Sequence, residues 1–178
     1  RYTRNVMDSV RKNGGKSFIS KVGHAFITED VNREGAYFAG ESSGHFYFRE
    51  TGGAESAVRV IIYILKALST TGKTLSELLS ALVSSHESGE RNFILPDGTD
   101  SKALMEQVTD EHKDARLSKL DGIALDYPEW RFSIRTSNTE PLLRLNVEAQ
   151  TEELMKQKFQ ELTDRIISTG AKEKSSGH

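Results

Sequence analysis

The sequence lacks cysteine, and it has only three prolines and one tryptophan among 178 residues. Without cysteine there is neither a disulfide framework nor a thiolate metal site, an absence that fits the reducing cytoplasm, where we expect the protein to be located. The sequence also has no apolar run near the roughly 20 residues of a membrane-spanning helix, and no charged-then-apolar signal segment at its start. We therefore expect no membrane partner.

An excess of positive charge is missing as well. The formal net charge is −2, and no run of lysine and arginine is interleaved with aromatic residues. Proteins that bind nucleic acid usually carry such a basic field, so we expect no nucleic acid partner. With 36% apolar and 28% charged residues, the composition is that of an ordinary globular protein with one or two modest cores.

The stretch from Arg135 to Arg144 reads Arg-Thr-Ser-Asn-Thr-Glu-Pro-Leu-Leu-Arg and has the densest polar chemistry in the chain. Apolar and polar residues alternate on both sides of it, over 130–135 and 143–148, which predicts two strands joined by a short connection that Pro141 helps to close. If both apolar rows face one core, Arg135 and Arg144 project from the opposite face. The pattern predicts a hairpin with two arginines side by side.

Three polar residues between these arginines, Ser137, Asn138 and Thr139, offer hydroxyl, amide and backbone donors. Because an arginine fork matches phosphate oxygens two at a time, we interpret the hairpin as a site for a dianion. The residues alone leave an alternative open, in which the arginines pair with Glu140 and Glu148 on a solvated face.

The amino-terminal part, residues 1–85, is predicted to be a layered α/β domain. The chain opens on Arg1 rather than on methionine, which we interpret as a start inside a domain. Apolar spacing and turn residues predict the following elements: helices near 6–10, 24–33, 54–68 and 74–82, and strands at 17–20, 36–39 and 46–48.

A polar linker at 84–90 leads to a second domain, residues 90–170, which is predicted to be α+β. Its small antiparallel sheet has four strands, with two helices on one face. We expect strands at 92–95 and 123–127 besides the hairpin, a helix over 100–112, and a last helix capped by Thr151. Residues 113–119 are expected to be loop and 171–178 a loose tail.

Residues 40–44 spell Gly-x-Ser-x-Gly, the nucleophile elbow of α/β-hydrolases, with Ser42 as the nucleophile. The acid and the base would then be Asp97 and His112, in the other predicted domain. The elbow needs a helix directly after the serine, whereas the residues from His45 to Phe48 have the composition of a strand. A serine hydrolase is therefore a remote alternative.

Two motifs some ninety residues apart resemble one family, the α-D-phosphohexomutases of the phosphomannomutase/phosphoglucomutase group. Arg-x-Ser-Asn-Thr-x-Pro with a following arginine is similar to that family's phosphate-binding loop, and Gly-Glu-x-Ser-Gly-His at 40–45 is similar to its sugar-binding loop. The resemblance covers nearly the whole chain, as most of the family's domain 3 and all of domain 4. It implies phosphate contacts from Arg135, Ser137, Asn138, Thr139 and Arg144, and sugar contacts from Glu41, Ser43 and His45.

Shorter likenesses extend this resemblance towards the amino end. The segment ending in His24 resembles the family's Thr-Gly-His segment, and residues 1–4 resemble a basic turn that faces substrate phosphate, so His24 and Arg1 are expected near the active site. The family often has methionine where this chain has Ser42. Asn138 and Ser42 favour mannose or glucose phosphates as substrates.

The family's reaction interconverts hexose 1-phosphate and hexose 6-phosphate through a bisphosphate, using a phosphoserine and Mg²⁺. The loops for both belong to the family's domains 1 and 2 and do not occur in this sequence, and the segment from Asp97 to Asp100 has too few carboxylates for that metal site. We expect no catalytic nucleophile and no metal site in this chain, and no activity without the missing N-terminal domains. The alternative is a stand-alone sugar-phosphate-binding module.

Overall fold

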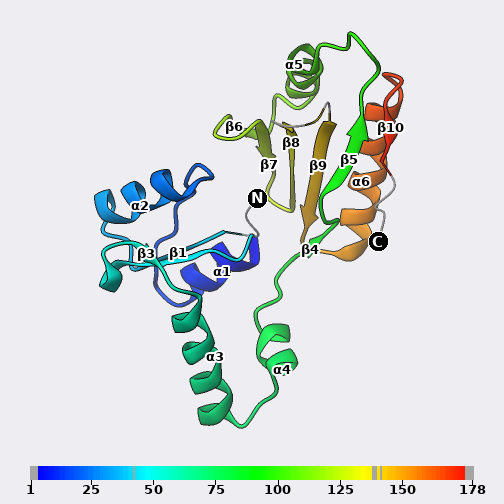
Figure 1. Cartoon of the computed structure of the whole chain (residues 1–178). Helices are drawn as coiled ribbons and strands as arrows, with labels where there is room; N and C mark the ends of the chain where they lie inside the picture. The colour runs from blue at the N-terminus through cyan, green and yellow to red at the C-terminus, as the bar shows by residue number, and fades with distance from the viewer. Residues whose placement is uncertain (1–3, 42, 138–139, 141, 175–178) are drawn as a thin grey trace. The chain divides into compact units, whose positions relative to one another are not determined.

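The computed structural model describes residues 4–174 except 42, 138–139 and 141. The chain divides into two compact units, unit 1 (Arg1–Ser84) and unit 2 (Ser85–His178). Figure 1 labels the helices and strands of both units.

Unit 1 combines helices with one small antiparallel sheet, in which the strand order is β1-β2-β3. Phe38 of β1 lies opposite Phe48 of β2, and Tyr47 of β2 lies opposite Glu55 of β3. The elements are α1 (Arg4–Lys12), α2 (His24–Arg33), β1 (Phe38–Gly40), β2 (Phe46–Phe48), a 3-10 turn η1 (Arg49–Thr51), β3 (Ala54–Glu55), α3 (Ala57–Thr71) and α4 (Leu75–Ser80).

The helix ends of unit 1 follow from local capping chemistry. The side chain of Ser56 accepts a hydrogen bond from the backbone of Arg59 at the start of α3, and Gly72 ends that helix in the left-handed conformation. At the start of α4, Thr74 and Glu77 form a reciprocal capping box. The helix predicted over 54–68 thus begins at Ala57, because Ala54 and Glu55 pair with β2 instead.

One predicted strand of unit 1 is wrong. Residues 17–20 are not paired with any strand in the described part of the chain, although their composition favours one. A strand needs a neighbour with which to exchange backbone hydrogen bonds, and sequence composition does not reveal whether that neighbour is there.

Unit 2 is built on a seven-stranded antiparallel sheet within the described residues, with the order β10-β5-β9-β8-β7-β6 and with β4 beside β9. In Figure 1, the long strand β9 lies between β8 and β5. The elements are β4 (His86–Glu87), β5 (Arg91–Ile94), α5 (Ser101–Glu111), β6 (Arg116–Ser118), β7 (Ile123–Asp126), β8 (Trp130–Thr136), β9 (Leu142–Ala149), α6 (Glu152–Ile167) and β10 (Lys172–Glu173).

The core of unit 2 lies between one face of this sheet and the helices α5 and α6. On β8 and β9 the inward residues pair across the ladder, with Phe132 opposite Val147 and Ile134 opposite Leu145. All four are fully buried. The helices contribute further buried residues to the same cluster, namely Leu104, Val108, Met155, Leu162 and Ile166. The opposite face of β8 and β9 is therefore left for polar side chains.

The predicted fold class, a layered α/β domain followed by an antiparallel α+β domain with two helices, is confirmed. The strand number was too low, however. The four longest strands, β5, β7, β8 and β9, match the expected sheet, but β4, β6 and β10 were predicted as linker, loop and tail. Strands of two or three residues are too short to show alternation, and they form because the edges and ends of longer strands offer unpaired backbone groups.

Candidate arginine and glutamate sites

Arg135 and Arg144 lie directly opposite each other on β8 and β9. Both point away from the helices, as the alternation of the two strands predicts. Their side chains are 31% and 26% exposed, so both are partly accessible to solvent. Two positive charges on adjacent strands repel each other unless an anion lies between them.

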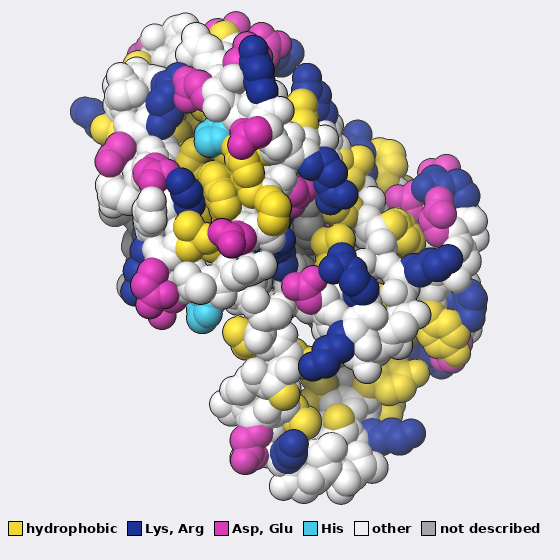
Figure 2. Space-filling view, turned by 180° about the vertical axis from the view of Figure 1, so that it is seen from behind, with side chains coloured by type: hydrophobic (Ala, Val, Ile, Leu, Met, Phe, Trp, Pro, Cys, Tyr) yellow, Lys and Arg dark blue, Asp and Glu magenta, His cyan; other side chains and the backbone are white. Residues whose placement is uncertain are grey.

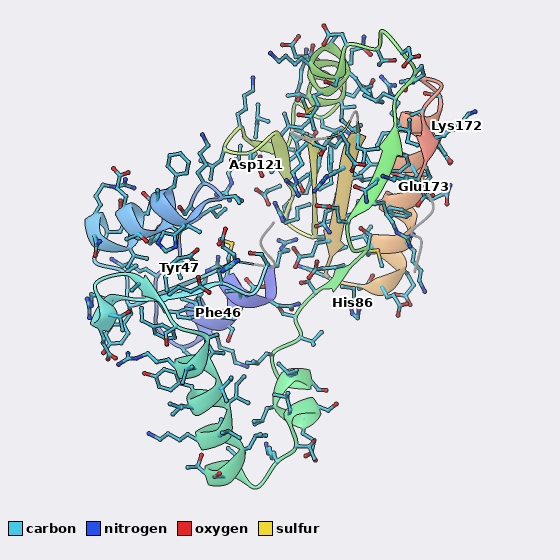
Figure 3. All side chains as sticks on the ribbon, viewed as in Figure 1. Phe46, Tyr47, His86, Asp121, Lys172 and Glu173 are labelled. Atoms are coloured by element: carbon cyan, nitrogen blue, oxygen red, sulfur yellow. The ribbon has the colours of Figure 1, made fainter. Side chains whose placement is uncertain are left out.

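That anion is the carboxylate of Glu90, which directly precedes β5. Arg135 Nη2 donates a hydrogen bond to Glu90 Oε2 at 2.8 Å, and Arg144 Nη1 donates one to Glu90 Oε1 at 3.3 Å. Asp121, labelled in Figure 3 between β6 and β7, adds a weaker ion pair, with its Oδ2 3.8 Å from Arg135 Nη1. The site thus consists of two guanidinium groups that are bridged by one carboxylate.

Sequence reasoning missed Glu90, which it placed in the linker. The only signal was a carboxylate directly before a predicted strand, and such residues are common. The pairing of β5 with β9 is what brings Glu90 beside Arg144, because Asn92 lies opposite Arg144 in that ladder.

The connection between β8 and β9 begins at Ser137, which completes the described part of this site. Its hydroxyl accepts a hydrogen bond from Arg144 Nη2 at 3.2 Å, and its backbone N–H donates to the carbonyl of Leu142 at 2.9 Å. The Nε of Arg144 is buried and has no hydrogen-bond partner among the described residues. The predicted contact residues Asn138 and Thr139, like Pro141, lie outside the described residues.

The alternative partners expected for these arginines, Glu140 and Glu148, bind elsewhere. Glu140 forms an ion pair with Lys174 at 3.0 Å. Glu148 is fully buried, accepts a hydrogen bond from the hydroxyl of Ser85 at 2.5 Å, and lies 3.7 Å from Arg131. The solvated hairpin with those two ion pairs is therefore wrong, since Glu90 takes the place of both.

In unit 1, the described residues between β1 and β2, which are Glu41 and 43–45, form a hydrogen-bonded turn. The backbone N–H of Glu41 donates to the carbonyl of His45 at 2.9 Å, and Gly44 donates back to the carbonyl of Glu41 at 3.0 Å. Gly44 has a φ of 91°, a conformation that favours glycine. His45 Nδ1 lies 3.0 Å from Glu55 Oε1, while Ser43 is exposed and Ser42 is outside the described residues.

Tyr47 connects two of the predicted site residues. Its hydroxyl donates a hydrogen bond to Glu41 Oε2 at 2.9 Å, and its ring meets that of His24 edge-on, with centroids 5.3 Å apart. Burial raises the pKa of Tyr47 to about 12, and the hydrogen bond to Glu41 acts in the same direction, so the phenol stays a neutral donor. Tyr47, labelled in Figure 3 near Phe46, was not among the predicted site residues, although the strand at 46–48 was predicted. Arg1 lies outside the described residues.

The described residues 43–48 do not form the helix that a nucleophile elbow would need after Ser42. Strand β2 begins at Phe46, where the elbow would need a helix. His112, the proposed base, belongs to unit 2, and its Nδ1 lies 2.7 Å from the hydroxyl of Tyr127. The serine hydrolase alternative is therefore wrong.

Neither metal clusters nor membrane-spanning helices are found within the described ranges. No group of three or more histidine and acidic side chains that could hold a metal ion is found there. No described helix is both long enough and apolar enough to cross a bilayer.

The class of protein is a two-unit one. An α/β unit is followed by an antiparallel α+β unit, which presents two arginines bridged by a carboxylate. Residues 1–86 match the family model described as phosphoglucomutase/phosphomannomutase, alpha/beta/alpha domain III, and residues 90–165 match the phosphoglucomutase/phosphomannomutase C-terminal domain. The chain belongs to the phosphoglucomutase/phosphomannomutase family of phosphohexomutases.

Relatives named phosphomannomutase align along almost the whole chain. The one from Methanocaldococcus jannaschii is 42% identical over 171 residues, which are 96% of this chain and 37% of that protein. The one from Vibrio cholerae is 43% identical, over 93% of this chain and 36% of its own length. A crystal structure of a phosphoglucomutase/phosphomannomutase family protein from Burkholderia thailandensis has the same fold, with a TM-score of 0.77 at 24% identity, over 96% of this chain and 37% of that one. The chain thus spans little more than a third of these proteins.

Proposed function

We propose that this chain is the substrate-recognition part of a phosphohexomutase that interconverts the 1-phosphate and 6-phosphate of mannose or glucose through a bisphosphate intermediate. The observation that carries this proposal is the pair of adjacent arginines, Arg135 and Arg144, on the polar face of the unit 2 sheet. The family assignment adds the chemical class of the ligand, since relatives are named phosphomannomutase.

The arginine pair suits the phosphate group that is not being transferred. Two guanidinium forks can each donate two hydrogen bonds to a tetrahedral dianion, and Ser137, Asn138 and Thr139 supply further donors from the connection. Phosphate binding then replaces the carboxylate of Glu90, which holds the two arginines together in its absence. A bound phosphate carries more charge than one carboxylate, which favours the exchange.

The turn of unit 1 suits the sugar. The free lone pairs of Glu41 can accept hydrogen bonds from neighbouring sugar hydroxyls, while Tyr47 holds its other oxygen in place. Ser43 is exposed and free to bind a hydroxyl, and His45 is a contact and proton shuttle. His24, beside Tyr47, and Arg1 would be neighbours of the reacting groups.

Catalysis itself is assigned to parts outside this chain. We infer that the phosphoserine and the Mg²⁺ ligands come from N-terminal domains 1 and 2, that a hexose bisphosphate is the intermediate, and that the chain alone is inactive. Phosphoryl transfer depends mainly on positioning and charge stabilisation, so a fixed phosphate site lets the sugar bind in two orientations. The proposed setting is the cytoplasm.

Turnover of the bisphosphate would require a joint between the two units. Most of the linker predicted at 84–90 is too far along the chain for this, because β4 pairs with β9 and Ser88 exchanges hydrogen bonds with Val147. Ser85 is tied to Glu148 as well. We therefore propose that the joint lies between Ser84 and Ser85, because the hydroxyl of Ser84 is hydrogen-bonded to Asn5 and Asp8 of α1 in unit 1.

The first test is calorimetric titration of mannose 1-phosphate, glucose 1-phosphate and inorganic phosphate into this chain at low salt. Arg135→Ala is expected to weaken binding by about ten-fold or more, because a hydrogen bond to a charged group contributes about 1.5 to 3 kcal/mol. Arg116→Ala is the matched control, since its exposed side chain lies on β6 and its loss removes the same charge.

Equal weakening by both variants would mean that only net charge matters, and no binding by the folded wild-type chain would contradict a preformed site. Mutase activity of the chain alone, measured with contaminating enzyme excluded, would contradict the assignment of catalysis to other domains. Binding without any gain of activity on addition of those domains would instead favour a stand-alone sugar-phosphate-binding module.

A further inference from the structure

The segment from Ala171 to Lys174 was expected to be part of a loose tail, but it belongs to the fold of unit 2. Ala171 is buried in the core cluster, and β10 then pairs with β5 in an antiparallel ladder. The backbone N–H of Lys174 continues this ladder by donating to the carbonyl of Asn92 at 2.8 Å. Figure 3 labels Lys172 and Glu173 on the strand. The position of this segment on the sheet is thus fixed by burial and backbone pairing.

The side chain of Lys174 reaches the connection between β8 and β9. Strand β5 lies between β10 and β9 in the sheet, so the segment is two strands away from Arg144. Lys174 Nζ forms an ion pair with Glu140 Oε1 at 3.0 Å. Glu140 is part of the connection itself, and its carbonyl accepts a hydrogen bond from the N–H of Leu142 at 2.7 Å. The C-terminal segment therefore contacts the connection that carries Ser137.

Glu140 is a negative charge within a segment that is otherwise rich in hydrogen-bond donors. It follows three residues after Ser137, whose hydroxyl accepts a hydrogen bond from Arg144. Because three residues of chain span at most about 11 Å, the backbone of Glu140 lies within about one Debye length of Ser137 at 0.1 M salt. A carboxylate so close to an anion site opposes the binding of a second anion unless its charge is neutralised.

The ion pair contributes little to the stability of unit 2. The side chains of Lys174 and Glu140 are 44% and 50% exposed, and exposed pairs of this kind are screened by solvent. Strand β10 has a second ion pair, with Arg91 Nη1 3.5 Å from Glu173 Oε1, so its place does not depend on Lys174. What Lys174 determines is the direction in which the Glu140 carboxylate points.

The surface around such a pair carries charges of both signs. Figure 2 shows acidic side chains scattered among lysine and arginine side chains rather than gathered in one patch. Where opposite charges alternate in this way, the field at an anion site depends on its nearest charges, because more distant ones largely cancel. A single carboxylate in the connection can therefore change phosphate affinity.

We propose that Lys174 is a positioning residue for the phosphate site, which neutralises Glu140 and holds its carboxylate away from Arg135 and Arg144. Without Lys174, this carboxylate would join Glu90 as a second competitor for the two arginines. The inference rests on the proposed phosphate binding, and it adds a residue from β5's outer neighbour, β10, to that site.

The test is calorimetric titration of inorganic phosphate into the chain at low salt. Lys174→Met keeps the length of the side chain but removes its charge, and it is expected to weaken binding about three-fold, as Coulomb's law gives for a carboxylate about 10 Å from a dianion in water. Adding Glu140→Gln should restore the wild-type affinity, and Lys174→Arg should retain it. Lys172→Met is the matched control, because Lys172 is exposed two residues away on the same strand.

The control variant should bind phosphate nearly as well as the wild type. Equal weakening by Lys172→Met and Lys174→Met would overturn the proposal, because net charge would then explain both. A double variant as weak as Lys174→Met would overturn it as well, since the loss would then come from the structure of β10 and not from Glu140.

Salt provides an independent measurement. The difference between wild type and Lys174→Met should shrink at about 1 M salt, where the Debye length is about 3 Å, and an undiminished difference would contradict an electrostatic role. Phosphate binding by the wild type with no effect of Lys174→Met would overturn this inference and leave the proposed function standing. No binding by the folded wild-type chain would contradict the proposed function itself, and this inference with it.

Discussion

The Glu90 carboxylate occupies the place between two guanidinium groups that an anionic ligand would take. In the proposed function it holds the two arginines together without ligand, and phosphate would compete with it for the same donors. Because its side chain is only 26% exposed, this competition is less screened by solvent than at a surface ion pair.

Glu90→Gln is therefore expected to tighten phosphate binding, by about two- to five-fold, which corresponds to about 0.5 to 1 kcal/mol. Glutamine keeps the size of the side chain but removes the competing charge. Asp121→Asn is the matched control and should have a smaller effect, because Asp121 is more exposed and lies 3.8 Å from Arg135. Calorimetric titration with inorganic phosphate measures both. Weaker binding by Glu90→Gln would show that the carboxylate aligns the arginines rather than competes.

His112 makes the stability of unit 2 depend on pH. Its ring packs against Phe132 with centroids 5.0 Å apart, and burial lowers its pKa from the ordinary value. The folded state then holds a proton less readily than the unfolded state, so stability is complete above the unfolded pKa of about 6.5 and falls as pH decreases through it.

The free energy of unfolding is thus expected to fall between pH 7.5 and pH 5.5, and His112→Gln should reduce this dependence. His86→Gln, at an exposed position on β4, is the control and should keep the wild-type slope. Urea unfolding at several pH values measures the difference. An identical pH profile for wild type and His112→Gln would assign the dependence to other groups.

The turn before β7 determines where Arg135 lies. Gly122 has a φ of 67°, and a Cβ at this position would overlap the carbonyl oxygen of Ile134 and lie 2.7 Å from the Cβ of Arg135. The absence of a side chain there lets β8 pass close to the turn. Two requirements, a left-handed conformation and close approach, thus meet at one glycine.

Gly122→Ala is expected to destabilise the chain by about 3 kcal/mol, the sum of a positive φ and an overpacked contact, and to weaken phosphate binding by displacing Arg135. Gly98→Ala is the matched control, because Gly98 has a φ of 79° with open space around it. It should cost about 1 kcal/mol and leave binding unchanged. Urea unfolding measures the loss of stability in both variants, and calorimetry measures their phosphate binding. An equal loss of stability in the two variants would show that β8 shifts easily.

The two units have cores of very different size. The cluster in unit 2 extends over β5, β7, β8, β9 and both helices, whereas that in unit 1 has three buried residues. Because stability grows with apolar area removed from water, unit 2 should be the more stable of the two. The isolated chain is then expected to unfold in two steps, with unit 1 first.

Two matched variants test this. Val31 and Val147 are both fully buried, one in each unit, and each Val→Ala change should cost about 2 kcal/mol locally. Val31→Ala should lower the midpoint of the first urea transition only, and Val147→Ala that of the second. Hydrogen exchange assigns each transition to its unit. A single transition shifted equally by both variants would show that the units unfold together.

Much of unit 2 could be predicted because its signals are local. The alternation along β8 and β9 predicted both strands and the common face of Arg135 and Arg144, and Thr151 marked the start of α6 through its side-chain cap. The short strands β4, β6 and β10 could not be predicted in this way. Their pairing depends on which backbone groups of longer strands are left open, and no property of two residues encodes this.

The sequence by itself therefore determined the family, the fold class, the main helices and strands, and the identity of the residues proposed to bind phosphate and sugar, since periodicity, caps and motifs lie within short stretches. Only the tertiary structure decided that Glu90 bridges the arginines, that Tyr47 connects Glu41 with His24, and that residues 17–20 pair with no strand in the described part of the chain. Each of these depends on groups far apart in the chain, and only strand pairing and packing bring such groups together or leave them apart.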